Sequence, residues 1–204
     1  MTRSARGFTL LEVLLALAIV GALVTIAFGG MRVALAAWRQ GEDRAEAHQH
    51  VRSAALTLAR AVGAAYPYRA SRGLAPEPVL LFEGAARRIA FVTQAPPFAP
   101  AAPIAFTAVV IELQAGEEPG LVVRQRPLPN RDPFEKAEVV FRDTGVTGFE
   151  VRYLDDAGTW QEEWKIENDK GPPRAVRLSI ETTAQGRAVR LPPLTVNLRT
   201  APPQ

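Results

Sequence analysis

Residues 8–28 form the apolar run Phe8-Thr-Leu-Leu-Glu-Val-Leu-Leu-Ala-Leu-Ala-Ile-Val-Gly-Ala-Leu-Val-Thr-Ile-Ala-Phe28. A helix of roughly 20 mainly apolar residues is long enough to cross the hydrocarbon core of a bilayer. Arg3 and Arg6 precede the run, and the next basic residue is Arg32. Because basic flanks stay in the cytoplasm, the sequence predicts residues 1–7 inside the cell and the bulk of the chain beyond the membrane.

Two features distinguish this run from an ordinary secretory signal. The small residue Gly7 comes before the apolar run, whereas a signal peptide carries its cleavage site after a shorter apolar core. In addition, the acidic residue Glu12 lies inside the run. An acidic residue at the centre of a membrane helix costs about 2.5–3.5 kcal/mol on insertion scales, and less near an end. We therefore expect Glu12 to have a function and a positively charged partner.

The string Arg6-Gly7-Phe8-Thr9-Leu10-Leu11-Glu12, with the apolar run that follows, resembles the N-terminal signature of type IV pilins and pseudopilins. The resemblance implies that a prepilin peptidase cleaves between Gly7 and Phe8 and methylates the new amine of Phe8. Methylation keeps the positive charge of that amine, and a buried charge needs a partner. The resemblance also implies that Glu12 acts in filament assembly by pairing with the amine of a neighbouring subunit.

Two other interpretations of Glu12 remain open at the level of sequence. The carboxylate can pair with the amine of its own chain rather than with that of a neighbour. Alternatively, residues 8–28 are a plain membrane anchor with an acidic residue near the interface. A plain anchor gives no reason for the whole string of residues 6–12, so we favour the pilin-like interpretation.

The helix is expected to continue well beyond the membrane. Residues 32–62 contain no proline, and Gly41 is their only strong helix breaker. Gly63 and the pair Tyr66-Pro67 are typical of a helix end. The sequence thus predicts one helix over roughly residues 9–62, whose second half packs on a folded domain. Its apolar face is formed by residues at helical spacing: Val51, Ala55, Leu58 and Val62.

From residue 79 onward the apolar pattern changes from helical to alternating, which is typical of strands with one buried face. The fold class expected is therefore α+β, with one long N-terminal helix packed on a mainly antiparallel sheet. The resemblance implies that this is the pilin-like fold. Strands are expected at 88–92, 106–114, 121–126, 138–143, 149–154, 159–164, 176–181 and 194–198, with turns at 116–120, 155–158 and 184–187 and loops at 95–103 and 127–133.

The sequence predicts three segments. Residues 1–7 are a cleaved leader peptide, and residues 8–31 are the membrane-spanning half of the helix. Residues 32–204 are a periplasmic domain in which the helix continues to about residue 62 and a β-rich part follows. We accordingly expect a single-pass protein of the bacterial inner membrane with its C-terminal domain in the periplasm.

The C-terminal half resembles one member of the pseudopilin family more closely. The string Phe149-Glu-Val-Arg-Tyr-Leu-Asp-Asp-Ala-Gly-Thr-Trp160, then Trp164, then Pro173-Arg-Ala-Val-Arg-Leu178, is similar to the J-type minor pseudopilin of type II secretion, general secretion pathway protein J. This resemblance implies a structural subunit at the tip of the periplasmic pseudopilus, which supports export of folded proteins across the outer membrane. It implies I-type and K-type minor pseudopilins as partners. Glu12 favours the J type, because the larger K type usually lacks this acid.

Composition excludes several classes of function. The chain has no cysteine, so disulfides and thiolate metal sites are absent, and a formal net charge of +3 without a basic stripe argues against nucleic-acid binding. His48 and His50 lie two residues apart on the expected helix and point in different directions, so we expect them to be solvated rather than to share a metal. No catalytic motif is present. We expect no enzyme activity, cofactor or small-molecule substrate.

Two sets of residues allow both a functional and a structural interpretation. Asp155 and Asp156 are candidate calcium ligands, but Asp-Asp-Ala-Gly is too short to surround the ion alone, and we favour a hairpin turn. Trp160 and Trp164 are candidate interface anchors, although filling the core or covering a sheet edge is the more common role for such residues.

Two other functions are compatible with parts of the sequence. A minor pilin of a type IV pilus, acting in adhesion or DNA uptake, carries the same N-terminus. Such tip proteins often have a disulfide-closed C-terminal region, and the lack of cysteine and of a basic patch argues against this class. A membrane-anchored enzyme would need a group of polar residues in one pocket, and the sequence does not indicate one.

Overall fold

A computed structural model of the chain describes residues 9–70, 78–99, 104–165, 171–184 and 187–198. The expected cleavage site between Gly7 and Phe8 lies outside the described residues. The chain divides into two compact units, Met1–Ala45 and Glu46–Gln204. Each unit is described by itself below.

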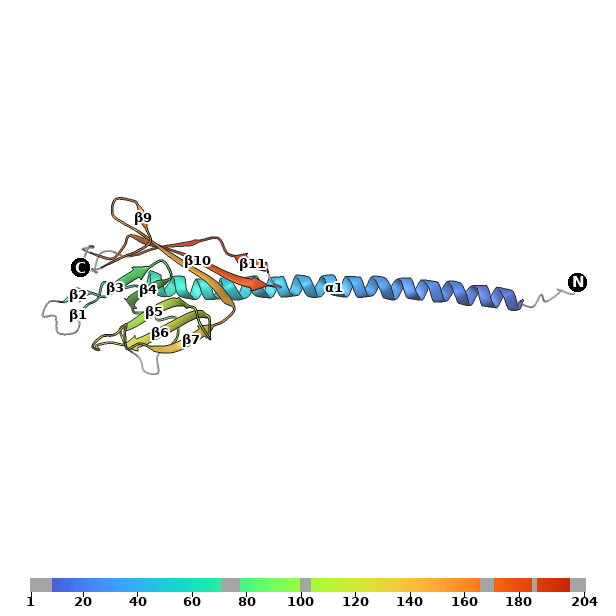
Figure 1. Ribbon diagram of the computed structural model, residues 1–204, viewed down its shortest axis with the longest axis horizontal. Coiled ribbons are helices and arrows are strands. Elements are labelled where there is room, and N and C mark those ends of the chain that lie inside the picture. The colour runs from blue at the N-terminus through green and yellow to red at the C-terminus, as the bar shows by residue number, and fades with distance from the viewer. Residues whose placement is uncertain (1–8, 71–77, 100–103, 166–170, 185–186, 199–204) are drawn as a thin grey trace, which may run out of the picture. The chain divides into compact units, whose positions relative to one another are not determined.

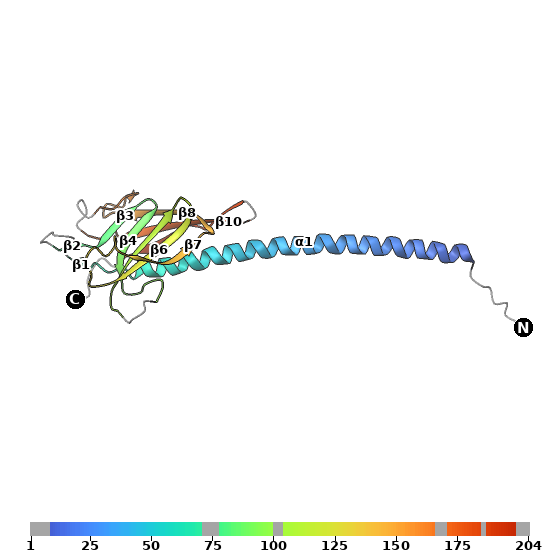
Figure 2. The same cartoon turned by 60° about the horizontal axis from the view of Figure 1, so that its bottom comes forward.

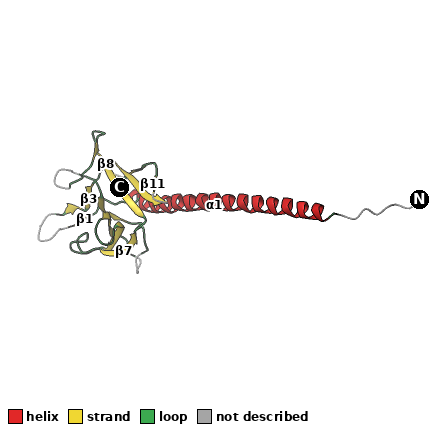
Figure 3. Ribbon diagram, turned by 45° about the vertical axis from the view of Figure 1, so that its right-hand side comes forward, coloured by secondary structure: helices red, strands yellow, loops and turns green. Residues whose placement is uncertain are grey.

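One helix, α1 (Leu10–Gly63), is the only helix of the described chain (Figure 3). Its bounds confirm the expected helix over residues 9–62 to within one residue at each end. The positive charge of Arg60 lies in the last turn, where it interacts favourably with the negative end of the helix dipole. The chain leaves the helix before Pro67, because the residue before a proline disfavours the helical conformation.

In the first unit, α1 is apolar on nearly all sides from Leu10 to Met31, with Glu12 as its one charged residue there. Every described residue from 9 to 45 is exposed, and the large apolar side chains range from 46% exposed at Val24 to 82% at Leu10. A helix that is hydrophobic all round is buried in a membrane or among other helices. The helix is also long and apolar enough to cross a bilayer.

The second unit contains a five-stranded antiparallel sheet in the order β3-β4-β5-β6-β7 (Figure 2). Its neighbouring strands are also neighbours in sequence: short turns join β3 to β4 and β5 to β6, and longer connections join β4 to β5 and β6 to β7. Gly116 and Gly120, with φ of 122° and 144°, adopt the positive φ that the turn between β5 and β6 requires. The strands are β3 (Phe82–Ala85), β4 (Arg88–Thr93), β5 (Thr107–Gln114), β6 (Gly120–Pro127) and β7 (Glu138–Asp143).

A second five-stranded sheet is built around β10, the longest strand. One edge of β10 pairs with β8, and the other edge pairs with β12 along its first half and with β11 along its second half. A separate two-stranded sheet joins β1 (Arg69–Ala70) to β2 (Val79–Leu80). The strands of the second sheet are β8 (Val146–Leu154), β9 (Trp160–Gln161), β10 (Ala175–Ala184), β11 (Arg187–Arg190) and β12 (Leu194–Asn197).

The main core of this unit lies where the last part of α1 meets both five-stranded sheets (Figure 1). All four residues of the expected apolar helix face are buried, and Val51 and Val62 are fully buried. They belong to one cluster with Phe91 and Ile111 of the first sheet and with apolar residues of β8 and β10 in the second sheet. Residues 46–63 of the helix are therefore held in place by burial of apolar surface. Such burial stabilises a fold by about 25 cal/mol for each Å² of apolar surface removed from water.

A smaller core covers the opposite face of the first sheet. Alternate residues of a strand point to opposite faces, so Ala90 and Val92 turn away from the main core and join Val110 of β5. Leu128 and Phe134, from the loop after β6, cover this face.

Tyr153 of β8 ties the two sheets together. Its side chain is fully buried, and its hydroxyl donates to the carbonyl oxygens of Ala85 (3.1 Å) and Arg88 (3.0 Å) at the β3–β4 turn. The ring packs directly over Gly84, where any Cβ would collide with it. Burial raises the pKa of Tyr153, which keeps the hydroxyl protonated as a donor.

The expected α+β class, with one long helix and antiparallel sheets, is confirmed. Differences occur where the local pattern is weak. Strand β3 was not expected, because Glu-Gly-Ala has low strand propensity, and it forms by pairing with β4. The expected turn at 184–187 is narrower, since β10 extends to Ala184 and β11 begins at Arg187. Strand β9 covers only Trp160–Gln161 of the expected 159–164.

We predict that Tyr153→Phe lowers the free energy of unfolding by about 1–3 kcal/mol, because the half-buried carbonyls of Ala85 and Arg88 lose the hydroxyl that they share. Urea unfolding of the full chain in detergent micelles, followed by tryptophan fluorescence, measures this change. The half-buried Tyr66 has no hydroxyl hydrogen bond to a described residue, and Tyr66→Phe is the matched control. Equal stability of the two variants would contradict the proposed tie between the sheets.

Candidate functional site

The N-terminus of α1 carries a reciprocal cap made by Thr9 and Glu12. The backbone N–H of Thr9 donates to Glu12 Oε2 at 3.3 Å, and the backbone N–H of Glu12 donates to Thr9 Oγ1 at 3.3 Å. The Thr9 hydroxyl also lies 3.4 Å from the same carboxylate oxygen. This arrangement is the capping box of the pattern Ser/Thr-x-x-Glu/Gln, which satisfies helix N–H groups that otherwise have no acceptor.

The cap places the carboxylate of Glu12 at the very start of the helix. Glu12 is exposed in the first unit, and the sequence puts Phe8 directly before Thr9. Phe8 and Gly7 lie outside the described residues, so the pairing of Glu12 with an amine stays a prediction. The sequence interpretation did not anticipate the capping role, although Thr9-x-x-Glu12 is itself the pattern for it.

His50 is not simply solvated, as the sequence had led us to expect. Its Nε2 lies 2.7 Å from Asp143 Oδ2, and the Asp143 side chain is only 7% exposed. The other carboxylate oxygen accepts the backbone N–H of Gly145 at 2.9 Å. The pair joins α1 to the end of β7 inside the second unit. Because 93 residues separate the two partners, no local pattern could have indicated it.

An apolar pocket of about 200 Å³ adjoins this pair. Leu58, Leu121 and Phe141 form its apolar lining, together with Phe98, whose ring stacks on Phe141 at 4.6 Å. Ser53 and Thr57 also line the pocket, but among the described residues neither is hydrogen-bonded to His50.

Asp155 holds a hairpin turn between β8 and β9. Its Oδ1 accepts the backbone N–H of Thr159 at 2.7 Å, and its Oδ2 accepts Nε2 of Gln161 at 2.8 Å. The N–H of Thr159, followed by the amide of Gln161, lowers the pKa of Asp155. Both oxygens are thus in use inside the turn, and the described residues contain no group of three or more acidic, histidine or cysteine side chains placed to hold a metal. These contacts favour the turn over the calcium site.

The two tryptophans lie in different surroundings. Trp164 is 5% exposed and belongs to the main core, where its Nε1 donates to the carbonyl of Gly171 at 3.2 Å. Trp160 is half-buried, and the guanidinium of Arg177 lies 4.0 Å from its ring centroid. A stacked cation of this kind fixes the aromatic ring. Any interface role of either residue stays a prediction.

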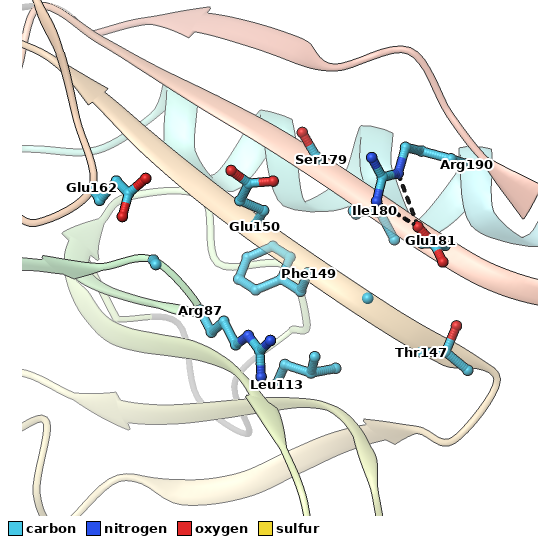
Figure 4. A pocket seen from close by; sticks show the side chains of 12 residues that line it. Arg87, Leu113, Thr147, Phe149, Glu150, Glu162, Ser179, Ile180, Glu181 and Arg190 are labelled. Carbon is cyan, nitrogen blue, oxygen red and sulfur yellow. Dashed lines mark hydrogen bonds and ion pairs between the residues drawn. The ribbon is translucent and has the colours of Figure 1, made fainter. Parts of the chain in front are cut away.

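A polar groove of about 330 Å³ lies along β8 (Figure 4). Most charges around it are compensated within the protein. Arg190 Nη2 lies 2.8 Å from Glu181 Oε2. Arg152 is 2.9 Å from Glu150 and 2.8 Å from Glu162, and the hydrogen bond to Glu150 is the main cause that raises the pKa of Arg152.

Comparison with known proteins yields two family matches. The family model described as type II secretion system (T2SS), protein J, matches residues 29–193. The model described as the prokaryotic N-terminal methylation motif matches residues 2–28. No curated protein gives a significant match. The two matched segments adjoin each other and together cover residues 2–193, which include α1 and all of the described strands except β12.

We predict that Asp155→Asn changes how stability depends on pH. The pKa of Asp155 is lowered in the folded chain, so its stabilising contribution is present above the unfolded-state value of about 4 and is lost as the pH falls through the folded-state pKa. The wild-type chain should therefore lose part of its stability advantage over Asp155→Asn when the pH falls from 5 to 3. The urea midpoint in micelles at both pH values measures this difference.

The neighbouring substitution Asp156→Asn is the control, because no described residue hydrogen-bonds to the Asp156 side chain. Asp156→Asn should show the same change in urea midpoint between pH 5 and pH 3 as the wild-type chain. If the urea midpoints of the wild type and of Asp155→Asn differed by the same amount at both pH values, the assigned role of Asp155 in the turn would be contradicted.

Proposed function

The chain belongs to the family of type II secretion system protein J and is a minor pseudopilin, and from this premise we propose that it stands at the tip of the periplasmic pseudopilus. The observation that supports the proposal most directly is the match of the protein J model over residues 29–193. The long helix, apolar over residues 10–28 except at Glu12 and Thr25, supports a subunit that is anchored and bundled through its N-terminus.

The helix and the family together describe a single-pass anchor in the inner membrane. The proposed orientation puts residues 1–7 in the cytoplasm and the C-terminal domain in the periplasm, because Arg3 and Arg6 flank the helix on one side. In the proposed assembly the N-terminal helices of several subunits form a bundle, and their folded domains contact one another outside it.

We propose that I-type and K-type minor pseudopilins are the direct neighbours of this subunit and that the complex supports export of folded proteins. Such a role is structural rather than enzymatic. The match to a family of structural pseudopilins supports this interpretation. The pilus alternative, in adhesion or DNA uptake, is not favoured, because the matched family is a secretion component.

In the proposed maturation, prepilin peptidase cleaves between Gly7 and Phe8 and methylates Phe8. The match of the methylation motif to residues 2–28 supports this step. The new ammonium group then lies at the start of the helix, close in sequence to the capping pair of Thr9 and Glu12. The positive end of the helix dipole lies there too, so an acid at this end is favourable.

We predict that the chain isolated from cells with an active secretion system begins at a methylated Phe8. Intact-mass and N-terminal peptide mass spectrometry measure both the cleavage and the added methyl group. Cells without prepilin peptidase are the control and should retain residues 1–7. A working secretion system with the leader still attached would overturn the proposed maturation.

We further predict that Glu12→Gln impairs assembly without preventing membrane insertion. Glutamine can occupy the same position of a capping box but carries no charge for the ammonium group, so the variant separates the two roles of Glu12. Expected results are normal membrane fractionation and a loss of about tenfold or more in co-purified I-type and K-type subunits, as for loss of a buried charged partner.

The matched control is Glu42→Gln, which neutralises an exposed acid farther along the same helix. This control should co-purify with its partners as the wild-type chain does. Normal assembly of Glu12→Gln together with impaired assembly of Glu12→Ala would show that the cap, and not the charge, is the contribution of Glu12.

A further inference from the structure

Strand β8 has an open edge along part of its length. One side of β8 pairs with β10 from Val146 to Leu154. On the other side, β9 pairs only with Tyr153 and Leu154. Between residues 146 and 152, no described strand pairs with this second edge. An unpaired strand edge offers N–H and C=O groups to any extended chain that reaches it.

The direction of the backbone groups on this edge follows from their neighbours. The N–H of Val151 donates to the carbonyl of Ala86 at 2.9 Å, away from β10. Ile180 of β10 lies opposite Phe149. Its carbonyl accepts the N–H of Leu191 at 3.2 Å, so it points away from β8. Since alternate residues of an antiparallel strand face the same edge, the N–H and C=O of Phe149 also point away from β10. No described residue hydrogen-bonds to either group.

The groove of about 330 Å³ lies beside this open edge. Figure 4 shows Arg87 and Leu113 on one side of β8, and Ser179 and Arg190 on the other. Gly148 has no side chain and leaves the groove open across the strand; a Cβ there would meet the side chain of Glu181. The volume is at the lower end of the range for binding pockets, so it suits a few residues of extended chain.

Arg87 is the charged residue of the groove that lacks a partner among the described residues. Glu150 and Glu162 are bound by Arg152, and Glu181 is bound by Arg190. Arg87 is exposed, and its described contact is through its carbonyl, which accepts the N–H of Leu113 at 3.1 Å. Among the described residues, the groove therefore presents one guanidinium without an ion-pair partner, which is complementary to a carboxylate.

We propose that β8 accepts an extended segment of another pseudopilus subunit, which adds a strand at Phe149 and places an acidic side chain against Arg87. Main-chain hydrogen bonds to a sheet edge give affinity, and side-chain contacts give specificity, in this mode of recognition. The proposal rests on the function proposed above, because it takes the partner from the same filament.

A neighbouring subunit fits this groove better than a secreted cargo does. The cargo of this system is folded, and native proteins protect the edges of their own sheets. A subunit held beside β8 in an assembled filament can supply a loop or terminal segment at high effective concentration. Even a short edge, with few hydrogen bonds, is then sufficient.

In-cell photocrosslinking from the open edge tests the source of the segment. The variant Thr147→p-benzoylphenylalanine puts the crosslinker on the exposed start of β8, and Glu117→p-benzoylphenylalanine puts it on the exposed β5–β6 turn as a control. We expect position 147, and not position 117, to give one crosslinked band that mass spectrometry identifies as another pseudopilin. A crosslink to secreted cargo, or none to a pseudopilin, would overturn the proposal.

A charge-swap experiment tests the chemistry of the groove in the full chain in micelles. The probes are the peptides acetyl-Thr-Val-Glu-Val-Thr-amide and its Lys counterpart, followed by amide NMR shifts at Phe149. Arg87→Glu should weaken binding of the Glu peptide about threefold to tenfold and favour the Lys peptide, as expected for an exposed ion pair reversed in sign. Arg131→Glu, at an exposed arginine in another loop, should leave both affinities unchanged.

A third peptide, N-methylated at both valines, separates strand addition from simple charge attraction. It keeps the acidic side chain but cannot donate from those residues to the strand edge, so we expect no shift at Phe149. Binding as tight as that of the unmodified peptide would contradict strand addition. These outcomes are distinct from failure of the proposed function, because cleavage at Gly7 and the assembly effect of Glu12 are measured without reference to β8.

Discussion

The structure depends on one constraint, which is that a single helix must be stable in two different surroundings. Residues 10–45 of α1 are exposed on every side and mostly apolar up to Val33, so they need lipid or other helices around them. Residues 46–63 bury one face, including Val51, Leu58 and Val62, in a protein core. Helix propensity alone does not hold so long a helix, since most helical stability in proteins comes from packing. The unbroken backbone lets the folded unit and the apolar anchor belong to the same element.

Within the folded unit, the joint between the two sheets explains both the stability of the core and the open edge of β8. Tyr153 donates its hydroxyl to carbonyls of the β3–β4 turn, and Val151 donates its N–H to Ala86 of the same turn. Hydrogen bonds in such dry surroundings are strong, and unpaired groups there are costly. The sheets are therefore fixed to each other at this end of β8. Toward Val146 no described strand pairs with the free edge of β8, and the groove beside Arg87 lies along that part of the strand.

Much of this architecture could be predicted from the sequence, because it follows from local periodicity. The helix face of Val51, Ala55, Leu58 and Val62 and the alternation of β8 and β10 are patterns within a few residues, and the structure confirms them. The missed features depend on residues far apart in the chain. The bond from His50 to Asp143 joins positions 93 residues apart, and β3 exists because β4 pairs with it. Arg87 looks like any surface arginine until the tertiary structure places it beside an open strand. The capping role of Thr9 and Glu12 is different, because its pattern is local and can be read from the sequence. At the level of sequence, Glu12 is instead interpreted as the partner of an amine.

The capping box does not by itself account for an acid at position 12. An N-terminal cap contributes about 0.5–2 kcal/mol, whereas a charged residue within a membrane helix costs up to about 2.5–3.5 kcal/mol, with the lower costs near the ends. A glutamine would fill the same place in the cap without that cost. The charge of Glu12 therefore needs a partner beyond the helix N–H groups. The ammonium group proposed at Phe8 is such a partner, and because Thr9 already holds the carboxylate at the start of the helix, little conformational freedom is lost when the two charges meet. On this view the cap prepares the acid for the amine, and the two roles of Glu12 support each other.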